Sequence, residues 1–295
     1  MFPIIPANSA TGASGNSEGI FGYGGSGGYI SVTNLVSNAG VVGSDVAGVG
    51  TARSELSACE YGGDKGIFGF GSPTTAVTNL VSNTGVVASD TAGVGMAMYK
   101  KAACGYGGDK GIFGFGYVGG VGSKSHTNLV SNAGVVASDT AGVGTARYIL
   151  AACEYGGDKG IFGFGGYAVT AITNLVSNTG VVASDTAGVG TARVDLAACG
   201  YGGDKGIFCG GYPRTELYSN LVSNAGVVAS DGTAVGSARN GLAGTQYDGD
   251  KGIFGYGYIS GNVSITNLVS NAGVVASDVS GVGTVRSSTA ACSFN

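Results

Sequence analysis

The stretch Ile161-Phe162-Gly163-Phe164-Gly165 belongs to a phrase that the chain carries six times. Each copy begins with Ile-Phe-Gly, or with Ile-Phe-Cys in the fifth copy, and successive copies start 45 to 49 residues apart. The copies start at Ile20, Ile67, Ile112, Ile161, Ile207 and Ile253. Asn-Leu-Val-Ser-Asn follows each copy, with Ala-Gly-Val-Gly-Thr-Ala-Arg or a variant of it further on. A fixed period of this length indicates one supersecondary unit copied six times.

The fourth copy shows how each unit is expected to fold. Residues 147–155 form a short apolar run that ends at Gly-Gly-Asp, which is a tight-turn signal. In residues 161–165 large side chains alternate with Gly, as in a strand with a close neighbour. Residues 173–178 and 181–184 give two more short strands around a turn. Because no segment has an apolar period of 3.6 over ten or more residues, each unit is predicted to form four antiparallel strands, A to D.

Four strands in about 46 residues is the size of one blade of a β-propeller. The first unit starts at strand B, near Glu18, and residues 285–295 at the end of the chain read as a strand A. A unit completed from both ends of the chain would close a ring and leave no open sheet edge. The sequence therefore predicts an all-β, six-bladed β-propeller over residues 17–295, preceded by an N-terminal arm of residues 1–16. An open solenoid is the alternative.

The order of these features resembles the Kelch repeat, in which an Arg opens the innermost strand and a Gly-Gly doublet closes the second. Gly165-Gly166 and Gly210-Gly211 match the doublet, whereas the chain has no Trp and has Met98 at one Arg position. The Arg is matched by Arg53, Arg147, Arg193, Arg239 and Arg286. The resemblance implies a propeller. The wording of the repeat also resembles Gly-rich repeats in predicted virion proteins of tailed phages from aquatic environments, which implies a place in a virion.

Composition narrows the classes of function. Gly supplies 60 of 295 residues, charged residues are 11% and the formal net charge is −4. Such a chain has no basic field for nucleic acid and no polybasic face for an anionic membrane. The first residues lack the features of a secretory signal, and no stretch approaches the roughly 18 apolar residues of a membrane-spanning helix. We therefore expect synthesis in the host cytoplasm, no nucleic-acid partner and no membrane insertion.

Five cysteines occupy one repeat position, which favours a structural role for them. Equivalent positions in successive units of a ring are too far apart for the roughly 5.5–6 Å Cα spacing of a disulfide. We therefore interpret these cysteines as small buried residues, with disulfides or metal ligation as the alternatives. They are Cys59, Cys104, Cys153, Cys199 and Cys292, and Cys209 replaces a Gly.

Aspartates also recur once per unit. We interpret them as turn caps or as partners of the repeat Arg, with calcium ligation as the alternative. They are Asp45, Asp90, Asp139, Asp185, Asp231 and Asp278. His126 is the only His, which excludes a metal site with several His ligands, including the copper site of the Kelch-type enzyme galactose oxidase. A lone His also leaves little for nucleophilic catalysis, so we expect no cofactor, no metal and no enzymatic activity.

The copies differ mainly in two places, the segment between strands B and C and the start of strand A. In an antiparallel four-stranded blade both places emerge on the same face, and loops on a rigid scaffold are where recognition usually lies. Tyr and Arg are favoured contact residues. The candidate binding residues are Tyr29, Tyr99, Lys100, Lys101, Tyr117, Lys124, His126, Tyr167, Tyr212, Arg214, Tyr218 and Tyr258. Drift in unconstrained loops is the alternative interpretation.

We therefore expect a non-enzymatic structural or adhesion protein of a phage virion, such as a fibre, tail or head-decoration protein. Its expected partner is a neighbouring virion protein or a host-surface glycan, bound through the variable B–C face. The alternative is an intracellular Kelch-type protein interaction module in the cytoplasm, and a hydrolase or oxidase propeller ranks third.

Overall fold

The computed structural model describes residues 16–213 and 216–295, so most of the expected N-terminal arm lies outside the described residues. The described residues contain 19 β-strands and no helix. The strands form six small sheets, and every strand pair is antiparallel. The predicted all-β class is confirmed.

The sheets follow the repeat, one for each copy of the unit. The first three sheets are β19 (Ala290–Phe294), β1 (Glu18–Gly25) and β2 (Tyr29–Val36); β3 (Ser57–Tyr61), β4 (Lys65–Gly69) and β5 (Thr78–Val81); and β6 (Ala102–Tyr106), β7 (Lys110–Val118) and β8 (Gly122–Val130). The last three are β9 (Ala151–Tyr155), β10 (Lys159–Gly163) and β11 (Thr173–Val176); β12 (Ala197–Tyr201), β13 (Lys205–Cys209), β14 (Tyr218–Val222) and β15 (Gly232–Thr233); and β16 (Ala243–Tyr247), β17 (Lys251–Tyr258) and β18 (Asn262–Val269).

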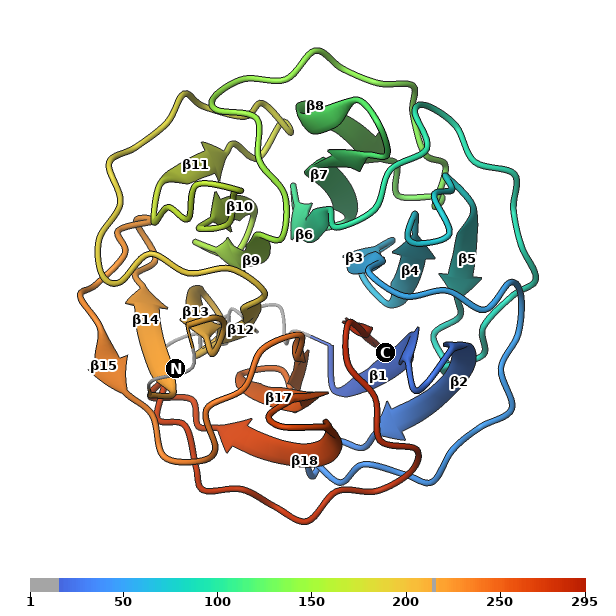
Figure 1. The fold of residues 1–295 in the computed structure, drawn as a ribbon, viewed down its shortest axis with the longest axis vertical. Coiled ribbons are helices and arrows are strands. Elements are labelled where there is room, and N and C mark those ends of the chain that lie inside the picture. Colours follow the sequence, from blue (N-terminus) through green and yellow to red (C-terminus); the bar gives the residue numbers. More distant parts are fainter. Residues whose placement is uncertain (1–15, 214–215) are drawn as a thin grey trace, which may run out of the picture.

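The six sheets surround a common centre, with the strand A of each sheet nearest to it (Figure 1). Each strand A contacts the strand A of the next sheet, from β3 through β6, β9, β12 and β16 to β19, and β19 contacts β3. The two ends of the described chain meet in the first sheet, because β19 pairs with β1 from Glu18↔Phe294 to Gly22↔Ala290. The C-terminal strand thus supplies the strand A that the first unit lacks.

The expectation of a fourth strand in each unit is wrong for five of the six sheets in the described part of the chain. Only the fifth sheet has a fourth strand, β15, which pairs with β14. In the fourth sheet the outer segment makes only the isolated bridges Thr173↔Thr186 and Val176↔Val182. Between these bridges the side chain of Asn174 donates to the carbonyl of Ala183. A side chain therefore takes a carbonyl that a continuous ladder would use.

The Ile-Phe-Gly phrase is explained by packing between units. The Phe of each phrase is buried, and in five of the six units its ring lies against the Gly of the preceding phrase. A Cβ added to Gly69 would lie 2.8 Å from the Cζ atom of Phe113, so a larger residue there would have to displace the ring. The ring also meets an aromatic residue of the preceding unit edge-on, as Phe70 meets Phe113 at 5.1 Å between ring centroids. The repeated phrase is therefore the core contact between neighbouring sheets, where aromatic burial stabilises most.

All six cysteines are free and buried, as expected from their place in the repeat. Burial raises the pKa of each thiol, which makes these thiols unreactive at neutral pH.

Backbone hydrogen bonds join each unit to the next at the turn between strands A and B. In this series an amide of one turn donates to a carbonyl of the following turn, as Gly62 does to Asp109. The series continues with Gly107 to Asp158, Gly156 to Asp204, Gly202 to Asp250, Asp248 to Ser17 and Asn295 to Asp64. Its last bond connects the C-terminal residue to the second unit.

Candidate functional site

The two variable places of each unit lie side by side. The start of strand A bridges to the segment that follows strand B, in the pairs Ser54↔Ser72, Tyr99↔Tyr117, Val194↔Tyr212 and Asn240↔Tyr258. We call the surface formed by the strand A starts and the B–C segments the variable face. Differences between copies therefore gather at one end of the strands.

The other ends of the A strands carry the Gly-Gly-Asp-Lys turns, which form what we call the turn face. Here the copies are nearly identical in contacts as well as in sequence. Lys159 Nζ lies 2.7 Å from Asp158 Oδ1, and Asn178 Nδ2 donates to the same carboxylate at 3.1 Å. These aspartates are therefore engaged in turn structure.

Six residues, one per unit, surround the centre of the variable face. They are Glu55, Lys100, Ile149, Asp195, Gly241 and Ser288, and we call this set the channel mouth. The amide of each residue donates to the carbonyl of the residue in the preceding unit, from Lys100→Glu55 around to Glu55→Ser288. The six donor–acceptor distances are 2.8 to 3.2 Å. The mouth is thus a closed series of backbone hydrogen bonds.

The channel mouth holds its backbone in an unusual conformation. All six residues have a left-handed φ, between 52° and 64°, which is uncommon outside Gly and is an outlier for β-branched Ile149. Each of the five residues other than Gly241 costs on the order of 1 kcal/mol in this conformation, and residues of this kind cluster at functional sites. The series of hydrogen bonds holds the conformation, and the left-handed turn directs five side chains around one opening.

The side chains of the mouth combine charge with aromatic rings. Lys100 Nζ lies 3.2 Å from Glu55 Oε1 and over the rings of Tyr99 and Tyr148, at 5.7 and 5.6 Å from their centroids. Tyr117 packs between the two tyrosines, at 5.5 Å from Tyr99 and 5.0 Å from Tyr148. An ammonium over aromatic faces is an attractive arrangement. The mouth therefore has one cationic and aromatic side, formed by the third and fourth units.

Asp195 is the remaining charged residue of the mouth. Burial raises the pKa of its carboxyl, and the charge of Lys100 and a hydrogen bond from Asn240 offset part of that shift. The bond from Asn240 Nδ2 is long, at 3.4 Å. Glu55 is close enough to raise the pKa further. The surroundings of Asp195 thus disfavour its ionised form, and its one hydrogen-bond donor is weak.

The candidate binding residues lie on the variable face in several environments. Exposed side chains are those of Tyr29, Tyr167, Tyr212 and Tyr258, and Tyr167 is the most exposed at 89%. Half-buried ones are those of Tyr99, Lys100, Tyr117, Lys124, His126 and Tyr218. Arg214 lies outside the described residues. Tyr148, Glu55 and Asp195 were not among the candidates, although they stand at the variable start of strand A, and that position alone could have identified them.

Lys101 is the one candidate that the structure removes from the binding surface. Its side chain is only 4% exposed, and Nζ donates to Asn128 Oδ1 at 3.2 Å. Nζ also lies 4.4 Å from the ring centroid of Phe70. In four other units the repeat Arg makes the bond to the repeat Asn, as Arg147 does with Asn174, and Arg147 also lies over the ring of Phe115.

Lys101 therefore takes the place of the repeat Arg, which is missing in the third unit because Met98 stands at its position. Met98 is fully buried at the Arg position, and Lys101 stands three residues later, where the second, fourth, fifth and sixth units have Leu. Cation and apolar side chain have exchanged places. Burial lowers the pKa of Lys101 to about 7, a shift that the charge of Asp139 partly opposes.

We expect the pair Met98→Arg and Lys101→Leu to restore the arrangement of the other units. Lys101→Leu alone leaves the oxygen of Asn128 without its donor, and Met98→Arg alone buries a second cation, so each single variant should be less stable than the wild type. In urea unfolding at pH 7 the double variant should be at least as stable as the wild type, with a coupling of about 1–3 kcal/mol. Additive effects of the two substitutions would contradict the exchange.

The repeat Arg and Asp residues belong to a buried network, and its Arg–Asn bond is formed in four units. Arg147 donates through Nη2 to Asn174 Oδ1 at 2.6 Å and through Nε to the carbonyl of Phe164 at 2.9 Å. Asn174 Nδ2 donates to Asp185 Oδ1 at 2.9 Å, and Thr145 Oγ1 donates to Asp185 Oδ2 at 2.6 Å. Although burial opposes it, these hydrogen bonds lower the pKa of Asp185.

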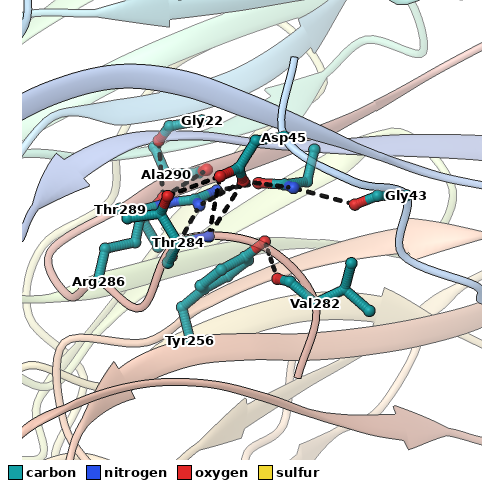
Figure 2. Close-up of polar contacts among 10 residues, drawn as sticks. Gly22, Gly43, Asp45, Tyr256, Val282, Thr284, Arg286, Thr289 and Ala290 are labelled. Carbon is teal, nitrogen blue, oxygen red and sulfur yellow. Dashed lines mark hydrogen bonds and ion pairs between the residues drawn. The ribbon is translucent and has the colours of Figure 1, made fainter. Parts of the chain in front are cut away.

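In the first unit the same network joins the two ends of the described chain. Figure 2 shows Arg286 and Thr284 facing Asp45, with Tyr256 beside them. Thr284 Oγ1 donates to Asp45 Oδ2 at 2.6 Å, and Arg286 Nη2 donates to Asn34 Oδ1 at 2.7 Å. The guanidinium of Arg286 lies 3.8 Å from the ring centroid of Tyr256. Side chains therefore reinforce the pairing of β19 with β1.

Deeper in the central channel, long and short side chains alternate from unit to unit. Glu60, Glu154 and Gln246 occupy one strand A position in the second, fourth and sixth units, and Ser293, Gly105 and Gly200 occupy it in the others. Each long side chain lies over the short residue of the preceding unit. Glu154 and Gln246 fill the space where Gly105 and Gly200 would have a Cβ, and Ser293 Oγ donates to Glu60.

The two carboxyls of the channel titrate far from their usual range. Burial raises the pKa of Glu60 to about 7, although the bond from Ser293 lowers it. Burial and the charge of Glu60 raise the pKa of Glu154 well above its usual value. The described residues hold no group of three or more His, Cys, Asp or Glu side chains that could bind a metal ion. Among them there is also no helix long and apolar enough to cross a membrane.

Comparison with known proteins gives no family: neither a family model nor a curated protein matches this chain.

Proposed function

We propose that the six sheets are the blades of a closed β-propeller and that this propeller is a non-enzymatic adhesion component of a phage virion, binding a host-surface glycan through its variable face. Support for closure comes from the pairing of β19 with β1 and from the two series of backbone hydrogen bonds that run through all six units. The low charge and the Gly-rich sequence of the repeat support a place in a virion.

The observation that carries the proposal is the separation of variable and constant residues. The two variable places of each unit lie side by side, and the constant turns lie at the other end of the strands. A rigid scaffold that varies at one end only is the usual arrangement of a recognition module.

The chemistry of the variable face favours a glycan. Sugars present C–H faces, which pack on aromatic rings, and hydroxyl groups, which bond to carboxylates and amides. The variable face offers the cluster of Tyr99, Tyr117 and Tyr148 beside Glu55, and exposed tyrosines such as Tyr167 further out.

A glycan array and purified particles test the proposal. We expect wild-type protein to bind a set of bacterial surface glycans, and Tyr99→Ala with Tyr117→Ala to weaken that binding at least about tenfold, because contact aromatics dominate such sites. Lys159→Ala on the turn face is the matched control and should bind normally. Absence of the protein from purified virions would refute the virion assignment, and capture of a cytoplasmic protein without glycan binding would favour the interaction module instead.

A further inference from the structure

We propose that the channel mouth binds a primary ammonium group, as carried by an amino sugar, with the carboxylate of Asp195 as its anchor. This inference rests on the proposed glycan-binding function and names the chemical class of its ligand.

The order of residues around the mouth leaves an opening between two carboxylates. The series of backbone hydrogen bonds places Asp195, Gly241, Ser288 and Glu55 in consecutive units. Gly241 has no side chain and Ser288 has a short one, and both line the cavity at the mouth together with Asp195 and Glu55. Asp195 and Glu55 flank the opening. A ligand that enters there meets acceptors on both sides.

Lys100 shows how an ammonium group is held at this mouth. Its Nζ atom lies 3.2 Å from Glu55 and faces two tyrosine rings at 5.6 and 5.7 Å. A carboxylate together with aromatic faces is a favourable environment for a cation. The mouth contains one such pair and a second carboxylate, Asp195, which feels the charge of Lys100 but forms no ion pair in the described part of the chain.

Asp195 lacks a strong donor. Among the described residues its side chain accepts one hydrogen bond, the 3.4 Å bond from Asn240. A desolvated carboxylate without a good donor is costly, and this cost appears as the raised pKa of Asp195. An ammonium at hydrogen-bond distance would supply three donors and a compensating charge.

The charge balance of the mouth selects the same class of ligand. Glu55 and Asp195 carry two negative charges when ionised, and Lys100 carries one positive charge. Lys101 also lines the cavity, but its ammonium is buried and is already bonded to Asn128. A cationic ligand neutralises the remaining charge, whereas a sugar carboxylate is repelled. A neutral sugar gains only hydrogen bonds that it would also make in water.

Calorimetry with two matched sugars tests the inference. We expect the methyl glycoside of glucosamine to bind the full-length protein at least tenfold more tightly than the methyl glycoside of glucose. Asp195→Asn should reduce the affinity for glucosamine to that for glucose, and Asp195→Glu should retain part of the preference.

Asp158→Asn, which removes a carboxylate from the turn face, is the control for net charge and should bind as the wild type does. An unchanged unfolding midpoint shows that Asp195→Asn folds. Equal affinity for the two sugars, or a preference that survives Asp195→Asn, would overturn the inference. The glycan array separates this outcome from failure of the proposed function: glycans without amino groups that bind through the variable face would leave that function in place, and an array without any binding would remove both.

Discussion

Replacing Arg147 by Met lowers the free energy of unfolding by about 3–5 kcal/mol, the usual cost of removing one member of a buried charged network. Arg147 is 1% exposed and donates to Asn174, to the carbonyl of Phe164 and to the carbonyl of Thr145. Met fills much of the same volume but donates to none of them. The buried oxygens lose their partners, and Asp185 loses the nearby cation. Urea unfolding followed by tyrosine fluorescence or circular dichroism measures the change.

Lys159→Met is the matched control for Arg147→Met. Lys159 also has an aspartate partner, but its side chain is 40% exposed on the turn face, where an ion pair contributes little. We expect a change within about 0.5 kcal/mol. Similar losses for the two variants would show that the repeat Arg is only a packing residue.

The double variant Glu60→Gln with Glu154→Gln should lack a pH dependence of folding stability that we expect in the wild type. Both carboxyls have a folded-state pKa above the ordinary value of 4.5, at about 7 for Glu60 and well above 4.5 for Glu154. Their contribution to stability is therefore fully present below pH 4.5 and is lost as the pH rises through 7. We expect the wild type to lose on the order of 2–3 kcal/mol between pH 5 and pH 8, and the double variant to lose much less.

Gln246→Glu provides the opposite change. Gln246 lies over Gly200 as Glu154 lies over Gly105. This variant therefore adds a third acid at an equivalent position, and its stability should fall more steeply as the pH rises. Below pH 7 the measurement is little affected by Lys101, since its lowered pKa of about 7 makes the wild type gain stability only as the pH rises beyond that value. A stability profile that is flat from pH 5 to pH 7 in the wild type would contradict the assignment.

The strands could be predicted from the sequence because their pattern is local. Gly-Gly-Asp marks a turn and alternating Phe and Gly mark a strand with a close neighbour, so strands A, B and C were expected where they lie. The fourth strand was also expected, but five of the six described sheets lack it. Asn174 takes one carbonyl of the outer segment through its side chain, and this competition depends on where the two segments meet in space. The pattern of the repeat did not reveal it.

The candidate site was likewise predictable only where it depends on position in the repeat. Position in the repeat placed the variable residues on one face, but it also placed Lys101 there. Only the contact with Asn128 shows that Lys101 replaces a missing Arg. The left-handed backbone of the channel mouth could not be predicted either, since Glu55, Lys100 and Ile149 do not favour that conformation. It arises from hydrogen bonds between units that are distant in the sequence.

The alternation of long and short side chains in the channel restricts how this chain can evolve. A Glu-bearing unit inserted after another Glu-bearing unit would bring a carboxyl onto the side chain of its neighbour, in the space that Gly105 leaves for Glu154. Two units with long side chains are therefore disfavoured as neighbours, whereas a unit with a short residue causes no such clash. We therefore expect a unit with a long side chain at this position to be gained together with a neighbour that carries a short residue there.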